Sequence, residues 1–458
     1  MSLVHELSSL LPAARISTRV ADLEVAAGDE SACQPVRPDV VVWPLSTDEV
    51  SRVVGCAWTH GVPVTARGAG SSLEGNPIPV RGGIVLDLSR MDAVVEVHQE
   101  DLQVSVQPGI VYNRLNEQLK PWGLFFPPSP GGSSDVATIG GMVANNASGI
   151  YSVKYGGTRE HVQAATVVTG TGHVLELGTR SRKTSSGYHL LGLVVGSEGT
   201  LAIATQLTLS LAGLPQGRKQ GALTFPTEKD AATAIATMMR YGVDLAAVEF
   251  LDRRSIVALN RYRGFGLEEQ PSLFLEVHGT PDSVDAVFET AQAVCEEQAG
   301  RVIVLPDGQN PWDVRHFTTR AIQALKPEGK TIRTDMGFPL SRLPEVVEHS
   351  YAIAERHGVV LHTFGHAGLG ILHALLREDP ADTQRWAAAQ RAKDEMVGFV
   401  LSVGGTASGE HGIGLGSQKY VAQEHGSSLA LMKHIKRVFD PKHILNPGKI
   451  WPDEGVDG

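Results

Sequence analysis

The stretch that decides the fold is Ala66–Asn76, which reads ARGAGSSLEGN and carries no apolar periodicity. It follows the β-prone run Val62–Thr65, so we expect a strand that opens into a glycine-rich loop. Successive backbone N–H groups in such a loop form a concave nest that suits an anion such as a pyrophosphate. The loop lacks the third glycine of GxGxxG, and this fingerprint occurs nowhere in the chain, which disfavours a Rossmann-type NAD site. Taken alone, the loop is as consistent with a structural turn as with a ligand site.

The sequence on either side of the loop predicts one α+β domain. Upstream, the β-rich run Asp39–Trp43 leads to Ser46, which with Glu49 forms a capping-box pattern for a helix to about His60 and gives a βαβ unit. Downstream, VVEVHQEDLQVSVQPG predicts two strands around a tight turn, and VYNRLNEQLKPWG predicts a helix that ends near Gly123. Glycine and proline cluster in LAGLPQG, where we expect this domain to end.

From about Arg218 the pattern changes to a β-α-β β-α-β order, which is typical of ferredoxin-like folds. The expected strands are Gln220–Phe225, Ala246–Phe250, Ser272–Val277 and Arg301–Val304, and the expected helices are Glu228–Arg240 and Pro281–Gln298. A further helix–strand set ends in VVLHTFGHAGLGILHALL and a long helix to about Val400. We therefore expect an α+β protein with a first domain at 1–214 (core about 36–214), an inserted domain at 215–405, and a C-terminal segment at 406–458 that returns to the first domain.

The composition is that of an ordinary globular protein. Of the 458 residues, 42% are hydrophobic and 20% are charged, and the formal net charge of −10 argues against a nucleic-acid groove or a polybasic membrane patch. No apolar run approaches the roughly 18–20 residues of a spanning helix, and the N-terminus lacks the pattern of a signal peptide. The three cysteines form no CxxC, which suits a reducing compartment. We expect a soluble cytoplasmic protein, with peripheral attachment to a membrane left open.

Three further stretches extend the glycine-rich pattern: Pro127–Gly157, Ser185–Leu209 and His443–Ile450. Within them, TIGGMVANNASG, GSEGT and NPGKI, together with ARGAGSSLEG, resemble the vanillyl-alcohol-oxidase-type (PCMH-type) FAD-binding flavoproteins. The resemblance covers nearly the whole chain. It points to the group of cytochrome-type D-lactate dehydrogenases, glycolate oxidase FAD subunits and D-2-hydroxyglutarate dehydrogenases. It implies a two-subdomain FAD-binding domain with an inserted cap domain for the substrate.

The same resemblance implies that the loop Ala66–Asn76 wraps the FAD pyrophosphate. No histidine stands in that loop, so we expect the FAD to be bound non-covalently. The implied FAD-binding residues are Arg67, Gly68, Ala69, Gly70, Ser71, Ser72, Gly75, Asn76, Pro130, Gly131, Thr138, Ile139, Gly140, Gly141, Asn145, Ser148, Gly149, Gly199, Ile203 and Asn446.

Two histidines, His366 and His373, flank AGLGIL between two β-like runs. If these runs form a hairpin, both imidazoles can reach one point, and two histidines with one carboxylate suit a divalent metal. Taken alone, such a pair more often consists of structural core or loop histidines. The resemblance implies that His366, His373 and Glu410 bind the metal, Zn or Mn, and that His411 of SGEHGIG is the base. Relatives usually read GHxGDGN, whereas this chain has leucine and isoleucine at the Asp and Asn positions, which leaves metal occupancy and substrate preference open.

A substrate anion needs a cation, and the run Trp312–Thr319 reads as a helix start with Arg315 and Thr319 four apart on one face. The resemblance implies that Arg315 clamps a substrate carboxylate and that Thr319 and Arg333 lie near it. His316 is either a substrate-orienting or a structural residue.

The implied reaction is oxidation of a D-2-hydroxy acid, such as D-lactate, to the 2-oxo acid. Hydride passes to flavin N5, and His411 takes the hydroxyl proton with help from the metal. The electron acceptor is a cytochrome, a quinone or an electron-transfer flavoprotein, and a homodimer is compatible with the sequence. The alternatives are a non-catalytic FAD electron-relay subunit of a glycolate-oxidase-type complex, an alkyl-glycerone-phosphate synthase-like transferase, and a metal-binding interaction module. The last of these leaves the glycine loops unexplained.

Overall fold

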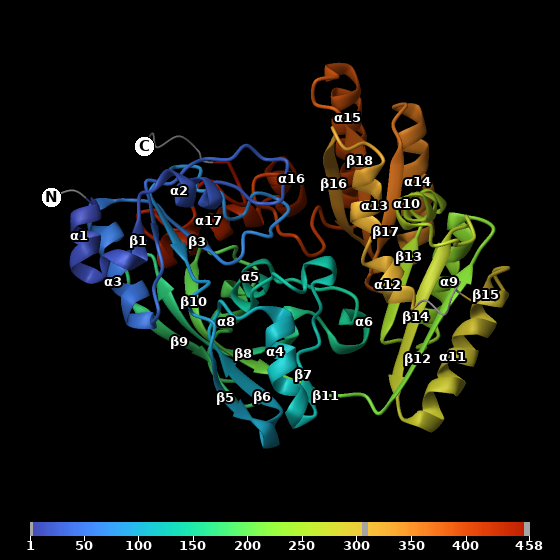
Figure 1. Cartoon of the computed structure of the whole chain (residues 1–458), viewed down its shortest axis with the longest axis horizontal. Helices are drawn as coiled ribbons and strands as arrows, with labels where there is room; N and C mark the ends of the chain where they lie inside the picture. The colour runs from blue at the N-terminus through green and yellow to red at the C-terminus, as the bar shows by residue number, and fades with distance from the viewer. Residues whose placement is uncertain (1–2, 305–309, 453–458) are drawn as a thin grey trace. The chain divides into compact units, whose positions relative to one another are not determined.

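The computed structural model describes residues 3–304 and 310–452, and the chain divides into two compact units; Figure 1 labels many of their elements. Unit 1 comprises Met1–Ser148, Gly156–Leu214 and Glu410–Gly458. Unit 2 comprises Gly149–Tyr155 and Pro215–Gly409. In the described part of the chain, no helix combines the length and apolar character needed to cross a bilayer.

Unit 1 begins with a four-stranded sheet in the order β1-β2-β4-β3, in which β2 and β3 both run parallel to β4. The predicted βαβ unit is present, but β4 lies between its two strands. The core strands read as continuous apolar runs because both faces are buried. The elements of this part are α1 (Leu3–Leu10), β1 (Ile16–Ser17), α2 (Val20–Ala26), β2 (Val40–Val42), α3 (Thr47–His60), β3 (Val64–Arg67) and β4 (Ile84–Asp87).

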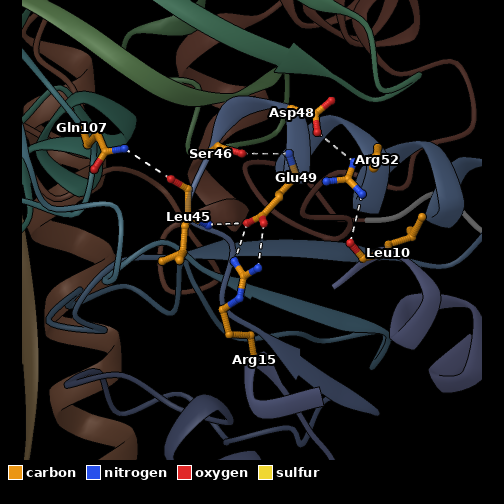
Figure 2. Close-up of polar contacts among 8 residues, drawn as sticks. All are labelled: Leu10, Arg15, Leu45, Ser46, Asp48, Glu49, Arg52 and Gln107. Carbon is orange, nitrogen blue, oxygen red and sulfur yellow. Dashed lines mark hydrogen bonds and ion pairs between the residues drawn. The ribbon is translucent and has the colours of Figure 1, made fainter. Parts of the chain in front are cut away.

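The start of α3 shows a cap that differs in one respect from the predicted capping box (Figure 2). The Ser46 hydroxyl accepts a hydrogen bond from the Glu49 backbone N–H at 3.3 Å, as predicted. The Glu49 carboxylate, however, accepts from the Leu45 N–H at 2.7 Å and forms a two-point ion pair with Arg15. In the predicted capping box the Glu49 carboxylate would accept from the Ser46 backbone N–H. It pairs with Arg15 instead, because the planar fork of arginine matches a carboxylate. Glu49 therefore attaches the N-terminal segment to the start of α3.

The second sheet of unit 1 is antiparallel, with the order β5-β6-β10-β8-β9. Its hairpin β5–β6 and the helix α4, which ends through a short 3-10 turn at Gly123, are as predicted. The apolar residues of β6, β8 and β10 pack with those of α4, α5 and α8 in one core. The elements are β5 (Val94–His98), β6 (Gln103–Val106), α4 (Tyr112–Leu119), β7 (Leu124–Phe125), α5 (Ile139–Asn145), α7 (Thr158–His161), β8 (Val162–Thr169), β9 (Val174–Gly178), α8 (Leu190–Val194), β10 (Ala202–Ser210), β11 (Ala212–Gly213), α16 (Gln418–His425) and α17 (Ser428–Phe439).

Unit 2 is built on a seven-stranded sheet in the order β15-β12-β14-β13-β17-β18-β16. Its first four strands have the ferredoxin-like order that the sequence predicts, and the hairpin β17–β18 with β16 extends this sheet. The helix α10 between β13 and β14 was not predicted; Asp252 caps its start and Gly264, with φ +64°, ends it. The elements are α6 (Ser152–Tyr155), β12 (Gly217–Thr224), α9 (Glu228–Arg240), β13 (Ala247–Leu251), α10 (Arg253–Arg263), β14 (Ser272–Gly279), α11 (Pro281–Glu296), β15 (Arg301–Ile303), α12 (Pro311–Arg315), α13 (Thr318–Ala324), β16 (Lys330–Gly337), α14 (Leu343–Arg356), β17 (Leu361–Gly365), β18 (Ile371–Glu378) and α15 (Thr383–Ser402).

The two faces of this sheet differ in chemistry. Side chains alternate between faces along a strand, and α11 packs against the face that carries Gly221, where an added Cβ would meet Phe288. The opposite face packs on α10, α12 and α13. The registers Ala247↔Glu276, Phe364↔His373 and Asp335↔His373 place Glu249, Glu276, His373 and Asp335 on this second face. Its carboxylates and imidazoles therefore share one layer with the short helix that carries Arg315.

Candidate active site

A cavity lies in unit 1, and its volume is ≈ 1340 Å³ when the solvent-filled space at its mouth is included. Its wall consists of the loop after β3, the first turn of α5, the turn before β10 and three residues of the C-terminal segment, Glu410, His411 and Asn446. Of the residues named from the sequence, the wall includes Arg67, Gly68, Ala69, Gly70, Ser71, Ser72, Asn76, Pro130, Thr138, Gly140, Gly141, Asn145, Ser148, Gly199, Ile203 and Asn446.

Four of the residues named from the sequence do not line this cavity. Ile139 is fully buried in the core beneath α5, because an apolar side chain in the first turn of an amphipathic helix points inward. Gly75 donates its N–H to Asp29, and Gly149 belongs to unit 2. Gly131 forms part of a 3-10 turn beside the wall residue Pro130.

The loop after β3 fits a diphosphate group. Its five backbone N–H groups from 69 to 73 donate no hydrogen bond to any residue that the structure describes, although the loop lines a cavity. Consecutive backbone N–H groups that face a cavity form a nest that suits an anion. At Gly68 a Cβ would lie 2.2 Å from Thr138 Oγ1, and Gly70 has φ +72°, a conformation that favours glycine. The donor set and the shape of this loop therefore fit FAD.

Helix α5 reaches the cavity because of close backbone packing. Its N-cap, Thr138, accepts a hydrogen bond from the Gly141 N–H, and the Gly140 N–H donates to the Pro108 carbonyl at 2.7 Å. A Cβ on Gly140 would lie 2.6 Å from the Pro108 Cβ. Glycine at this position therefore lets α5 lie directly on the Pro108 turn, with Asn145 on the cavity wall.

A buried carboxylate, Glu198, connects three of the four parts of this wall: its own turn before β10, the loop after β3 and the C-terminal segment. It accepts hydrogen bonds from Asn76 Nδ2 at 2.6 Å, the Ile413 N–H at 2.7 Å and the Gly414 N–H at 2.8 Å. The Asn446 amide completes the connection by donating to the Glu198 and Asn76 carbonyls. Burial raises the pKa of the Glu198 carboxyl above its ordinary value. The hydrogen-bond donors and the charge of Lys449 oppose this rise. Glu198 is the glutamate of the GSEGT motif named above, but the motif does not show which distant groups its carboxylate holds.

Glu410 and His411 lie on the same wall. Ser148 Oγ donates to Glu410 at 2.8 Å, and Asn145 Nδ2 donates to the His411 carbonyl at 2.9 Å. His411 Nε2 lies 3.7 Å from Glu410 Oε1. The next residue, Gly412, has φ +78°, and a Cβ there would lie 2.9 Å from Glu198 Oε1. The glycine therefore allows the chain to turn tightly, so that both reactive side chains reach the cavity.

In unit 2 the hairpin β17–β18 brings His366 and His373 together, with ring centroids 5.5 Å apart. Nδ1 of His366 lies 2.5 Å from Oε1 of Glu249, and Nδ1 of His373 lies 3.5 Å from Oδ1 of Asp335. Histidines that bind metals usually direct one ring nitrogen to a carboxylate, which fixes the tautomer and makes Nε2 the ligand atom. The donor set therefore fits a divalent metal. Glu249 and Asp335 are polar supports that the sequence analysis did not identify.

Arg315 is held in the same layer of unit 2. Its Nε donates to Glu249 Oε2 at 2.7 Å, and its Cζ lies 4.6 Å from the centre of the Phe364 ring. Its two Nη groups donate no hydrogen bond to any described residue, so the fork is available to an anion. Burial alone would raise the pKa of Glu249, but His366 and Arg315 outweigh it, and the pKa lies below its ordinary value.

The predicted helix through Arg315 and Thr319 is wrong in one respect. Helix α12 ends at Arg315 and α13 begins at Thr318, so the two residues do not share one helix face. The Thr318 hydroxyl donates to the Arg315 carbonyl at 2.7 Å and supports the break. His316 is the C-cap of α12. Arg333 lies on β16, on the face that carries Asp335.

The chain matches two known domain families. Residues 38–178 match the family described as "FAD binding domain", and residues 214–450 match "FAD linked oxidases, C-terminal domain". A mitochondrial cytochrome-type D-lactate dehydrogenase of Arabidopsis thaliana is 38% identical over 421 residues, which is 91% of this chain and 74% of the relative. The glycolate oxidase subunit GlcD of Bacillus subtilis is 32% identical over 423 residues, which is 90% of this chain and 89% of the relative.

A solved structure of p-cresol methylhydroxylase with substrate bound matches the fold at TM-score 0.84. It is 17% identical and covers 100% of this chain and 97% of that one. The fold is thus the PCMH-type FAD-binding fold with an added α+β unit, and the protein is an FAD-dependent oxidoreductase. The chain belongs to the family of FAD-linked oxidases that includes the cytochrome-type D-lactate dehydrogenases.

Proposed function

We propose that this protein oxidises a D-2-hydroxy acid of the D-lactate type to the corresponding 2-oxo acid, with FAD as the hydride acceptor. The observation that carries the proposal is Arg315, a buried guanidinium fixed at Nε with both Nη groups available. This is the geometry that a carboxylate requires. The D-lactate dehydrogenases among the relatives support the same substrate class.

Arg315 binds the substrate carboxylate through two parallel hydrogen bonds and thereby fixes the direction of the C2–H bond. When bound, FAD would supply the hydride acceptor, its N5 atom, for the C2–H bond that Arg315 orients. We assign Thr319 and Arg333 to the same carboxylate site, as the family resemblance implies. The neutral imidazole of His411 takes the hydroxyl proton, a role that suits histidine near pH 7.

We assign a divalent metal, Zn or Mn, to His366, His373 and Glu410. When bound, the metal would polarise the substrate hydroxyl as a Lewis acid and lower its pKa. Ser148 holds the Glu410 carboxylate, Glu249 orients the His366 imidazole, and Asp335 Oδ1 lies 3.5 Å from Nδ1 of His373. The acceptor that would reoxidise the flavin is a cytochrome, a quinone or an electron-transfer flavoprotein.

The test is anaerobic flavin reduction in the purified FAD-loaded protein, with D-lactate, longer D-2-hydroxy acids and their L enantiomers. We expect D acids to bleach the flavin, and we expect His411→Ala and Arg315→Ala to slow bleaching by at least about 100-fold. His434→Ala, which removes an exposed histidine of α17, is the matched control and should bleach at the wild-type rate.

Absence of bleaching with every hydroxy acid would refute the proposal. It would favour the relay subunit or a transferase like alkyldihydroxyacetonephosphate synthase, which shares the fold at TM-score 0.77 and 20% identity. Wild-type rates in both active-site variants would refute the assignment of His411 and Arg315.

A further inference from the structure

Glu249 lies on β13, is fully buried, and makes two different ion pairs with its two carboxylate oxygens. Oε1 faces Nδ1 of His366 at 2.5 Å, and Oε2 accepts from Nε of Arg315 at 2.7 Å. The two partners are 117 and 66 residues away in the sequence. One carboxylate therefore contacts both the hairpin with the two histidines and the helix with the anion-binding arginine.

We infer that Glu249 is a shared positioning residue, which sets the ring orientation of His366 and the guanidinium orientation of Arg315 together. In the proposed oxidation, which this inference presupposes, the metal and the substrate carboxylate would then be placed by one side chain. Neither the sequence motifs nor the comparisons assign a role to Glu249.

The strand that carries Glu249 is suited to this role because it is held on both sides. Strand β13 pairs with β14 along its length and with β17 through Phe250↔Gly365. A carboxylate on such a strand is a more precise anchor than one on a loop. Because Arg315 compensates its charge and all three groups are buried, the hydrogen bonds are charge-assisted and little screened by water.

Each contact has a distinct chemical consequence. A carboxylate on Nδ1 holds the proton there, which makes Nε2 of His366 the ligand atom and raises its basicity. A carboxylate on Nε of Arg315 leaves the two Nη groups to form the fork that a substrate carboxylate fits. Removal of either contact should weaken one site, and a change in Glu249 should weaken both.

The neighbouring strand offers a matched control in Glu276. Glu276 is fully buried on the same face, opposite Ala247, and it holds His278 and the indole N–H of Trp312. Trp312 lies on α12, as Arg315 does. Glu276 therefore anchors the same helix to the same sheet, but it makes neither of the two contacts of Glu249.

The decisive variant is Glu249→Asp, which keeps the charge but retracts the carboxylate by about 1.5 Å, one carbon–carbon bond. The first measurement is the affinity of the FAD-loaded protein for Zn²⁺ and Mn²⁺, in competition with a chromogenic chelator. The second is the affinity for propionate, followed by the change in flavin absorbance. Propionate has a carboxylate for Arg315 but no hydroxyl for a metal. We expect both affinities to fall about tenfold or more in Glu249→Asp and to stay within about twofold of wild type in Glu276→Asp.

The inference is overturned if either affinity is unchanged in Glu249→Asp, if Glu276→Asp lowers both equally, or if the wild-type protein binds neither metal. If Glu249→Asp does not fold, Glu249→Gln keeps the side-chain length, and we expect its metal affinity to fall about 10–100-fold. An unchanged metal affinity in that variant also overturns the inference. Both measurements are equilibrium binding measurements, so they decide the role of Glu249 whether or not a hydroxy acid reduces the flavin. If no hydroxy acid reduces the flavin, the proposed oxidation is refuted, and the role of Glu249 is still tested.

Discussion

Helix α5 approaches Pro108 so closely that a substitution of Gly140 should affect both the stability of the protein and its catalytic rate. In Gly140→Ala the new Cβ would lie 2.6 Å from the Pro108 Cβ and 2.9 Å from its carbonyl oxygen. Carbon atoms prefer about 3.5–4.0 Å, so α5 or the Pro108 turn must move by roughly 1 Å. Overpacking of this kind costs about 1–3 kcal/mol. For a unit of this size we expect the melting temperature to fall by roughly 2–12 °C.

The same displacement should reach His411. Asn145, the last residue of α5, donates to the His411 carbonyl at 2.9 Å. A shift of about 1 Å takes this contact beyond the limit of a hydrogen bond. A misplacement of that size in a catalytic group can lower the rate about 100-fold. Gly140→Ala should therefore lose FAD occupancy and slow flavin reduction, beyond its effect on stability.

The assay compares Gly140→Ala with Gly55→Ala, the same substitution in α3, where a Cβ would meet nothing within 4 Å. The control should gain about 0.5–1 kcal/mol of stability, because alanine favours a helix over glycine. FAD content per chain, thermal unfolding of the FAD-loaded protein and the anaerobic rate of flavin reduction are measured for both. If Gly140→Ala keeps wild-type values of all three, the reasoning about this contact is refuted.

Two further predictions concern carboxylates of unit 1. Glu49→Gln should lower the free energy of unfolding by about 1–2 kcal/mol at neutral pH. Hydrogen bonding to Arg15 holds the pKa of Glu49 below its ordinary value of 4.5, so the stability difference between the variant and wild type should shrink as the pH falls below that value. Thermal unfolding measures this difference. A difference that stays constant from neutral to acid pH contradicts the assignment. Glu198→Gln should turn an amide nitrogen toward one of the three N–H donors and cost roughly 2 kcal/mol. Chemical denaturation checks this change, and a variant as stable as wild type would show that these hydrogen bonds do not hold the wall.

The fold was predictable where local pattern and tertiary structure agree. The amphipathic helices α9 and α11 and the strands beside them carry their periodicity in the sequence, and the ferredoxin-like order follows from their succession. The hairpin around AGLGIL was predictable for the same reason. The break after Arg315 was not, because no glycine or proline marks it and a threonine hydroxyl supports it instead.

The supporting carboxylates of the candidate site could not be found from the sequence. Glu249 stands alone in an apolar run, and Glu198 belongs to GSEGT, but the side-chain partners of both lie between 66 and 216 residues away. Only the folded chain shows that Glu249 meets both His366 and Arg315. The residues that a motif identifies are those that act on a ligand, whereas the residues that hold them in place depend on long-range packing.

The wall of the cavity also has a consequence for how the protein is made. It combines the loop after β3 with His411 and Asn446, which leave the ribosome more than 330 residues later. The nest for the diphosphate can form early in synthesis. Glu198 and Asn76, however, can bind their partners in the C-terminal segment only after the last part of the chain has emerged. During that interval the incomplete cavity exposes the apolar surface that FAD would cover. In a nascent chain, therefore, the wall of the cofactor cavity is complete only after the C-terminal segment has been made.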